Sequence, residues 1–202
     1  MKLMAFQYCV LNTKMRLLNG ILATFLTLFL TTNLGFAQQL LSEADFLSAA
    51  FPDLEPKREK LWIKADIKEN VKAILGHEYG ALRIRYWGVG QKTAWILEEI
   101  GKEQPITIGI VVAGRKVQSI QILDYRESRG WEVKYPFFTD QFNQVSLTPD
   151  LKLSSRIDGI SGATLSVRAV TNIARLALYL HGLTPYDAGE ETPDTAQTKV
   201  AD

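Results

Sequence analysis

The residue types that could support chemistry are concentrated in one short segment, DGISGAT at residues 158–164. Two glycines, an acid and the hydroxyls of Ser161 and Thr164 stand there directly before an amphipathic helical pattern. Spacing alone leaves two interpretations open. In the first, Ser161, Thr164 or Ser166 merely caps the helix after a glycine-containing turn. In the second, the free N–H groups and positive partial charge of the helix N-terminus hold a phosphate at or beside Thr164.

A second cluster follows a predicted strand, in the sequence YRESRGW at residues 125–131. It places charged side chains, Gly130 and the aromatic ring of Trp131 close together. Taken alone, this cluster is typical of a solvated turn with a half-buried tryptophan. Its value as a site depends on what packs opposite it.

Other residues that often carry chemistry are sparse. The two histidines, His77 and His181, have no partner at ligand spacing, so we expect neither a metal site nor a catalytic residue there. His181 is expected to benefit from the partial negative charge at the C-terminus of the last helix. Residues 88–93, GVGQKT, resemble a phosphate-binding loop only superficially and are predicted to form a hairpin turn.

The element that must position DGISGAT is the helix behind it, which Gly182 is predicted to end. Its predicted apolar face consists of Val170, Ile173, Ala174, Ala177 and Leu178. The residues predicted to point outward are Arg168, Asn172 and Arg175.

Upstream of this helix the period of the hydrophobic pattern changes to two, which predicts strands. Apolar and other side chains alternate at residues 82–87, and further strands are expected at 93–100, at 106–112, which is strongly apolar throughout, and at 117–125. The short turns between these strands make them antiparallel. Residues 126–157 are irregular, with Phe137, Phe138 and Phe142 clustered on a short helix. A long aromatic-containing loop inside a compact domain is more often functional than idle.

The segment before the strands is predicted to be helical. Ser42 opens a first helix that ends at Phe51, and Asp66 caps a second helix that ends at Gly76. The charged segment 53–60 between them is predicted to be a loop. The whole is an α+β fold, a single domain with an antiparallel sheet and helices packed on one side.

The N-terminus has the three parts of a secretory signal peptide, predicted at residues 1–37. Lys14-Met15-Arg16 is positively charged, Leu17–Leu34 is largely apolar, and Gly35-Phe36-Ala37 supplies the small residues of a cleavage site. Either Met1 or Met15 could be the start. The alternative is a retained membrane anchor, because the apolar run is nearly long enough to span a bilayer. Both interpretations place the protein in the periplasm or elsewhere outside the cytoplasm.

Composition agrees with a soluble globular domain, with 47% hydrophobic and 22% charged residues. The formal net charge of +1 argues against a dedicated nucleic-acid binder. The single cysteine, Cys9, lies in the segment expected to be removed, so the mature chain would have no disulfide and no thiolate chemistry. The remaining segments are predicted to be an N-terminal helical part at 38–79, the main domain at 80–187, and a disordered tail at 188–202.

DGISGAT also matches, position for position, the flavinylation motif of the FMN-binding domain family, which occurs in the C and G subunits of the Nqr and Rnf respiratory complexes and in secreted flavin carriers. The resemblance implies that Thr164 carries FMN through a phosphoester bond. It further implies that a periplasmic, Mg-dependent flavin transferase makes this bond with FAD as donor. Asp158, Ser161, Gly162 and Ala163 would be the sequence that the transferase recognises and the turn that holds the phosphate.

The likeness covers about residues 80–181, so the FMN-binding domain is predicted within 80–187. It implies that the flavin ring lies against the 126–142 loop, nearest to Glu127, Arg129, Gly130 and Trp131. The respiratory-complex members have Glu-Thr-Pro-Gly where this chain has Glu-Ser-Arg-Gly at 127–130. They are also larger, which favours a stand-alone carrier here.

The resemblance therefore implies an exported flavoprotein that relays electrons between membrane or periplasmic partner proteins. Because no histidine, cysteine or carboxylate pair is placed for proton chemistry, a carrier is expected rather than an enzyme that converts a substrate. Two alternatives remain open. One is a redox-sensing or accessory module that binds FMN reversibly, and the other is a structural adaptor without a cofactor.

Overall fold

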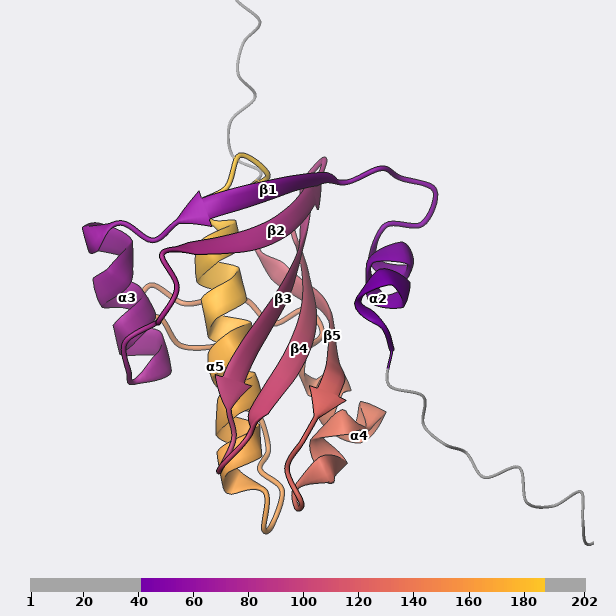
Figure 1. The fold of residues 1–202 in the computed structure, drawn as a ribbon, viewed down its shortest axis with the longest axis vertical. Coiled ribbons are helices and arrows are strands. Elements are labelled where there is room, and N and C mark those ends of the chain that lie inside the picture. Colours follow the sequence, from indigo (N-terminus) through magenta and orange to yellow (C-terminus); the bar gives the residue numbers. More distant parts are fainter. Residues whose placement is uncertain (1–40, 188–202) are drawn as a thin grey trace, which may run out of the picture. The chain divides into compact units, whose positions relative to one another are not determined.

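The structure is a computed structural model that describes residues 41–187. The predicted signal peptide, with Cys9 and both possible start residues, and the predicted tail lie outside the described residues. The elements, in chain order, are α2 (Glu43–Ala50), β1 (Lys57–Trp62), α3 (Ala65–Leu75), β2 (Arg83–Val89), β3 (Lys92–Ile100), β4 (Pro105–Ala113), β5 (Lys116–Tyr125), α4 (Pro136–Thr139) and α5 (Thr164–His181) (Figure 1). Two short 3₁₀ turns, Trp131–Lys134 and Asp140–Phe142, flank α4.

The five strands form one sheet in the order β1-β2-β3-β4-β5, and each pairs antiparallel with the next. This order follows from the short turns, since a tight turn returns the chain beside the strand it has just left. The residues at 88–93 do form a hairpin, with the turn at Gly90 and Gln91. The predicted α+β class with an antiparallel sheet is thus confirmed.

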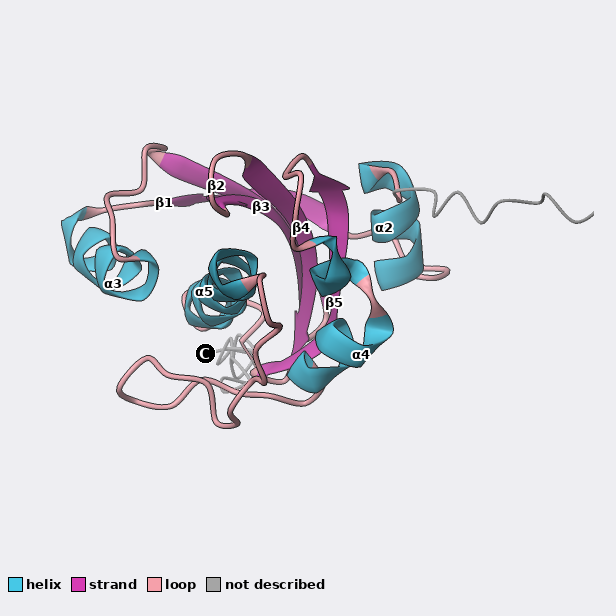
Figure 2. Ribbon diagram, turned by 90° about the horizontal axis from the view of Figure 1, so that it is seen from below, coloured by secondary structure: helices cyan, strands magenta, loops and turns pink. Residues whose placement is uncertain are grey.

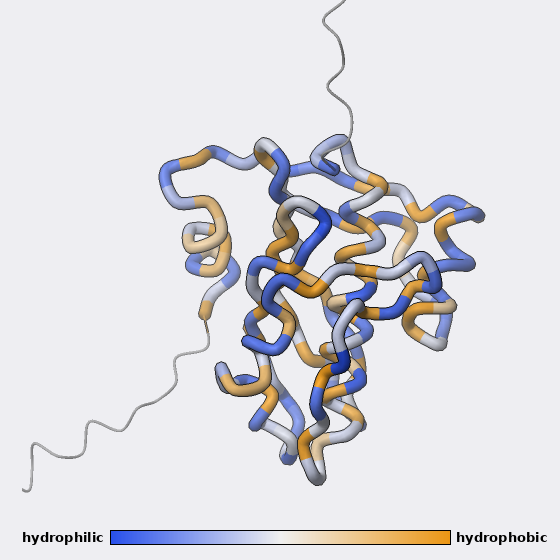
Figure 3. Tube along the Cα trace, turned by 180° about the vertical axis from the view of Figure 1, so that it is seen from behind, coloured by the Kyte–Doolittle hydropathy of each residue, from blue (hydrophilic) through white to orange (hydrophobic). Residues whose placement is uncertain are grey.

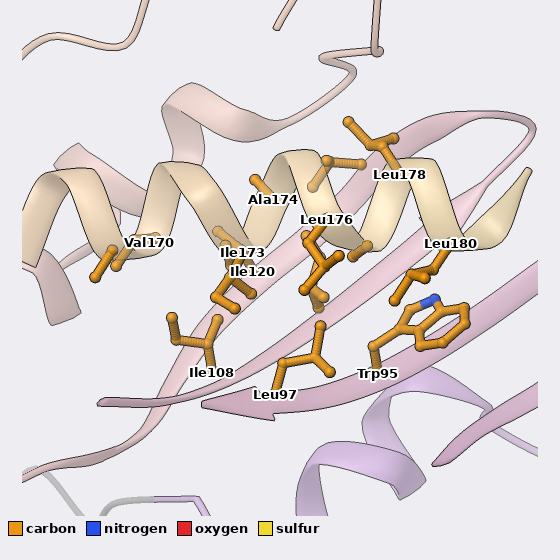
Figure 4. Close-up of a cluster of buried hydrophobic side chains, with 14 of the residues drawn as sticks. Trp95, Leu97, Ile108, Ile120, Val170, Ile173, Ala174, Leu176, Leu178 and Leu180 are labelled. Atoms are coloured by element: carbon orange, nitrogen blue, oxygen red, sulfur yellow. The ribbon is translucent and has the colours of Figure 1, made fainter. Parts of the chain in front are cut away.

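The sheet curves around α5, which lies along its concave face (Figure 2). Apolar side chains of α5 such as Ile173 and Leu180 pack above Trp95, Leu97 and Ile108 of the strands (Figure 4). Hydrophobic and hydrophilic residues are interspersed along the chain (Figure 3), and β2 shows the alternation of buried and exposed side chains typical of a strand with one buried face. Each fully buried side chain of this size contributes about 1.5–3 kcal/mol to folding, so this layer fixes the position of α5.

Two residues of α5 predicted to point outward are instead packed against other parts of the fold. Asn172 is buried and its side-chain amide donates to the carbonyl of Leu75 at the end of α3. Arg175 donates to the carbonyls of Leu151 and Ile74. The prediction failed because α5 is enclosed by α3 and the 143–157 loop as well as by the sheet, and these neighbours are distant in sequence. Arg168 is exposed as predicted.

The helices do not all lie on one side of the sheet. Helix α2 packs on the face opposite α5, where Phe46 and Phe51 contact Ala94, Val111 and Leu123 (Figure 2). Its capping by Ser42, whose hydroxyl accepts from the N–H of Asp45, agrees with the prediction.

The segment predicted as a loop at 53–60 contains most of strand β1, so that prediction is wrong. Almost all side chains of β1 are exposed on both faces. The strand therefore lacks the apolar alternation that identifies a half-buried strand, and backbone pairing with β2 defines it. The cap predicted for the second helix is also different, because Lys64 is the N-cap of α3 and Asp66 lies in its first turn.

A short helix, α4, is present as predicted and contains Phe137 and Phe138, whereas Phe142 lies in the 3₁₀ turn that follows it. Only Phe138 and Phe142 are buried and packed edge to face, because Phe137 points outward and is 61% exposed. The irregular segment around α4 runs back across the open side of α5 to residue 158. Between residues 41 and 187, no helix has both the length and the hydropathy needed to cross a membrane.

Candidate functional site

The N-terminus of α5 is open. Ala163 occupies the N-cap position, and no side chain caps the helix, so the prediction of a cap by Ser161, Thr164 or Ser166 is wrong. The first bond of the helix is donated by the N–H of Val167 to the carbonyl of Ala163. The N–H groups of the three preceding residues have no partner among the described residues. Together with the partial positive charge of an 18-residue helix, they form an anion site.

The three hydroxyls near this helix start differ in their availability. Ser166 is buried, and its Oγ lies 2.9 Å from Tyr125 Oη. Ser161 is exposed in the turn that leads to the helix. Thr164 is exposed at the first position of the helix, and its hydroxyl forms no hydrogen bond with a described residue. Only the Thr164 hydroxyl is therefore both free and beside the unbonded N–H groups.

The loop after β5 forms the opposite wall and approaches the helix start closely at Gly130. This glycine has φ +84°, and a Cβ there would lie 2.8 Å from Tyr125 Oη and 2.9 Å from Ser166 Oγ. Tyr125 Oη donates to the carbonyl of Arg129 at 2.5 Å, so Ser166 donates to Tyr125. Burial raises the pKa of Tyr125, which keeps this donor protonated. A glycine at 130 lets the loop and the helix start contact each other.

The turn between β3 and β4 is the third part of the site, after the start of α5 and the loop after β5, and Glu127 binds this turn through hydrogen bonds. Its Oε1 accepts from the backbone N–H groups of Lys102, Glu103 and Gln104 at 2.5, 2.6 and 2.9 Å. These donors, chiefly those of Gln104 and Glu103, lower the pKa of the Glu127 carboxyl. Because this oxygen is already engaged, Glu127 positions the turn as well as lining the site.

A pocket of about 580 Å³ lies between these three parts, which is within the range of small-molecule sites. Its lining residues are Lys102, Glu103, Glu127, Ser128, Arg129, Gly162, Ala163, Thr164, Leu165 and Ser166. The structure thus brings together five residues proposed from the sequence, Glu127, Arg129, Gly162, Ala163 and Thr164. The sequence did not identify Lys102 or Glu103, since only the pairing of β3 with β4 carries their turn to the helix start.

The other proposed residues lie outside this lining. Gly130 stands behind the wall, in contact with Ala163 and Ser166. Asp158 and Ser161 belong to the exposed approach to the helix, and the N–H of Asp158 donates to the side chain of Gln141. Trp131 follows the wall and packs edge to face on Tyr135, with ring centroids 5.4 Å apart.

The side chains that line the pocket carry two positive charges, on Lys102 and Arg129, and two negative charges, on Glu103 and Glu127. Attraction for an anion therefore comes from the N-terminus of α5 and from Arg129. The Arg129 side chain is exposed and forms no ion pair with a described residue, whereas Lys102 pairs with Glu103 at 3.0 Å. In the described part of the chain, no three His, Cys, Asp or Glu side chains gather in a group that could hold a metal ion.

Both histidines lie away from this pocket. His181 is fully buried, and its Nδ1 lies 2.8 Å from Thr93 Oγ1, which also accepts from the indole N–H of Trp95. Burial lowers the pKa of His181, so the expected charge interaction with the helix end is replaced by a neutral core imidazole. His77 Nε2 lies 2.9 Å from Glu99 Oε1 at the protein surface.

Comparison with protein families assigns the region that contains this site. No curated protein matches the chain. Residues 101–179 match the model of the FMN-binding domain, a span that begins at the turn held by Glu127 and includes most of α5. The match indicates FMN as the cofactor, and residues 101–179 of this chain belong to the FMN-binding domain family.

Proposed function

We propose that this protein is an exported flavoprotein that carries FMN on Thr164 through a phosphoester bond and relays electrons between partner proteins. The observation that carries the proposal is the free, exposed hydroxyl of Thr164 at an uncapped helix N-terminus inside the pocket. The neighbouring Ser166 hydroxyl is buried and bonded, which leaves Thr164 as the accessible acceptor on the helix.

The residues of the pocket fit the chemical groups of FMN. The unbonded N–H groups at the start of α5 would hold the phosphate, and Arg129 would add a positive charge beside it. Leu165 offers apolar surface for the ring system within the lining, and Trp131, 45% exposed, offers aromatic surface just beyond it. When bound, FMN supplies reversible electron transfer, which no side chain of the site provides.

The bond to Thr164 would be made by transfer from FAD. Thr164 Oγ1 forms a new P–O bond with the phosphorus of the FMN half, the pyrophosphate bond of FAD breaks, and AMP leaves with release of the hydroxyl proton. A flavin transferase would catalyse this step, and Asp158 and Ser161 are exposed where such an enzyme could read them. Retention of the cofactor would then no longer depend on affinity, which suits a protein outside the cytoplasm.

A carrier is favoured over an enzyme because both carboxylates among the described lining residues are already engaged, Glu103 in an ion pair with Lys102 and Glu127 through its Oε1 atom. The Oε1 atom of Glu127 is occupied by three backbone donors, and both histidines are elsewhere. The partners would be the flavin transferase together with membrane or periplasmic redox proteins.

The proposal is tested by exporting the chain together with a flavin transferase and denaturing the purified product. Flavin fluorescence should remain with the unfolded protein, and peptide mapping should find one FMN on the peptide that contains Thr164. Flavin released in full by denaturation would support the reversible-binding alternative. A product without flavin from a cell in which the transferase modifies a known substrate would contradict both.

A further inference from the structure

A second concave surface lies at the opposite end of the domain, on the hairpin formed by β1 and β2. This hollow of about 940 Å³ is lined by Arg58, Lys60, Trp62, Ala81, Leu82, Arg83 and Arg85. We refer to it as the basic face. It contains four cationic side chains and no acidic residue, although the chain as a whole is close to neutral.

The strand register explains why these side chains gather on one face. Lys60 lies opposite Arg85, and Trp62 lies opposite Arg83. Directly opposed residues of an antiparallel pair point to the same side, and residues two apart along a strand share that side. Ile84 and Tyr86, the residues between, point into the core against α5. The basic face is therefore built into the sheet.

The four cations are not neutralised within the described part of the chain. None of them forms an ion pair there. Arg83 instead lies over the ring of Trp62 at 5.8 Å, and Arg58 lies over the ring of Trp87 at 5.9 Å. Like charges held together without counter-charge raise the free energy of the isolated domain, and an anionic partner removes this cost.

Exposed apolar groups stand among these cations. Leu82 is 76% exposed and Trp62 is 54% exposed, both at the same end of the hairpin. Tryptophan prefers the interface between water and lipid, and arginine and lysine can extend their charges to headgroups while their stems contact apolar surface. A mixture of cations, tryptophan and leucine fits an anionic lipid surface, where the headgroups can pair with the cations while Trp62 and Leu82 enter the interfacial layer.

The basic face also lies far from the pocket at the start of α5. Strand β1 crosses the sheet at the C-terminal end of α5, whereas Thr164 begins that helix (Figure 1). An 18-residue helix is about 27 Å long. A surface so far from the pocket is poorly placed for a redox partner, but it can hold the domain while leaving the pocket accessible.

We propose that the basic face of the β1–β2 hairpin docks the domain on a membrane surface containing anionic phospholipid. The inference does not depend on a flavin at Thr164. The apolar run Leu17–Leu34, whether signal or anchor, is separated from the first described residue only by residues 35–40. When retained, such an anchor would keep the basic face within reach of the bilayer.

The test uses a fluorescent label at the basic face, because such a label reports lipid contact at that face and not lipid binding by the apolar run Leu17–Leu34. Cys9 is the only cysteine of the chain, so a Cys9→Ser, Leu82→Cys protein carries a single environment-sensitive dye. The matched control places the dye at Ile100, another exposed aliphatic residue, 59% exposed at the end of β3. Both full-length proteins are titrated with phosphatidylcholine vesicles with and without phosphatidylglycerol.

The dye at position 82, but not the dye at position 100, should shift to the blue with phosphatidylglycerol, and salt should weaken the response. Replacing Arg58, Lys60, Arg83 and Arg85 by glutamine should weaken lipid binding by roughly 100- to 1000-fold at low salt. Glutamine at Lys116, Lys152, Arg156 and Arg168, four exposed cations elsewhere, should leave it unchanged. An equal shift without phosphatidylglycerol, an unaffected quadruple variant, or a shift produced by soluble polyglutamate but not by vesicles would overturn the proposal.

Discussion

At the scale of single residues, the site depends on which hydroxyl and which N–H groups remain free. The sequence motif identified Thr164 among several hydroxyls, and the structure adds the physical difference between them. Ser166 is buried against Tyr125, whereas Thr164 is exposed beside unbonded N–H groups. This difference could not be derived from spacing, because it depends on a tyrosine about forty residues earlier in the chain.

Gly130 is the residue at which the wall of the pocket is most sensitive to substitution. Gly130→Ala would hold a β-carbon at φ +84° within 3.0 Å of Tyr125 Oη and Ser166 Oγ. The left-handed conformation alone costs about 1–2 kcal/mol for a non-glycine residue. We expect a lower free energy of unfolding in urea and a reduced fraction of flavin-bearing protein. Gly80→Ala, at an exposed glycine where a Cβ would meet nothing within 4 Å, is the control, and equal behaviour of the two variants would argue against a close contact at Gly130.

His181 makes the stability of the fold depend on pH. Its pKa is lowered by burial, so below the ordinary histidine pKa of 6.5 the unfolded chain binds a proton that the folded chain resists. Stability should therefore decrease as the pH falls below this value, by up to about 1.4 kcal/mol per pH unit.

The measurement is urea unfolding at several pH values, compared between the wild type and His181→Gln. The variant should be less stable at neutral pH but should lose this part of the acid dependence. His77 affects the pH dependence of stability in the opposite direction, because contact with the carbonyl of Glu78 and with Glu99 raises its pKa. Both proteins contain His77, so its effect cancels in the comparison. Parallel pH profiles for the two proteins would show that the buried imidazole does not titrate as proposed.

At the scale of elements, local patterns predicted the helices and the central strands well. Alternation identified β2, a continuous apolar run identified β4, and short turns delimited β3 and β5. Gly76 ended α3 as expected, with φ +84°. Strand β1 was missed because both of its faces are exposed, so no pattern marks it. The inward positions of Asn172 and Arg175 were missed because their partners belong to α3 and to the 143–157 loop.

The turn at 101–104 is the element that Glu127 holds, and its rigidity should depend on the charge of that carboxylate. Glu127→Gln keeps an acceptor oxygen but removes the charge. Amide hydrogen exchange at residues 102–104 should become faster by roughly tenfold, since hydrogen bonds to a charged group are stronger than neutral ones.

The same turn should loosen in the wild type at low pH. Because the folded-state pKa of Glu127 is lowered from 4.5, its contribution is fully present above that value and is lost as the pH falls through the lowered pKa. The control is Glu132→Gln, because the carboxylate of Glu132 accepts no hydrogen bond from a described residue. Amide exchange at residues 102–104 in this variant should equal that of the wild type. Unchanged exchange in Glu127→Gln would show that the charge is not needed.

At the scale of the whole molecule, the sheet separates the candidate pocket from the basic face. Its concave face holds α5 and the pocket, while its opposite face carries α2 and the basic face of the β1–β2 hairpin. The fold class was predictable because short turns leave few ways to arrange consecutive strands. The placement of α2 and α5 on opposite faces of the sheet was not predictable, because it depends on contacts between α2 and strands that are distant in the sequence.

This separation predicts that α2 contributes to stability but not to the flavin site. Phe46 is 1% exposed on the far face, and Phe46→Ala should lower the free energy of unfolding by about 3–5 kcal/mol. The fraction of protein carrying flavin should stay at the wild-type level under conditions where the variant remains folded. Leu54→Ala, at an exposed residue beside α2, should change neither quantity. Loss of flavin from a folded Phe46→Ala protein would mean that the two faces are coupled.

The central claim is that the Thr164 hydroxyl bears the flavin, and intact-mass measurement after export beside a flavin transferase tests it most directly. The wild type should gain the mass of one FMN joined with loss of water. Thr164→Ser, which keeps a hydroxyl at the start of α5, should gain the same increment, and Ser166→Ala should as well, apart from any loss of stability. Thr164→Ala should gain nothing. A Thr164→Ala protein that still carries covalent flavin would contradict the account.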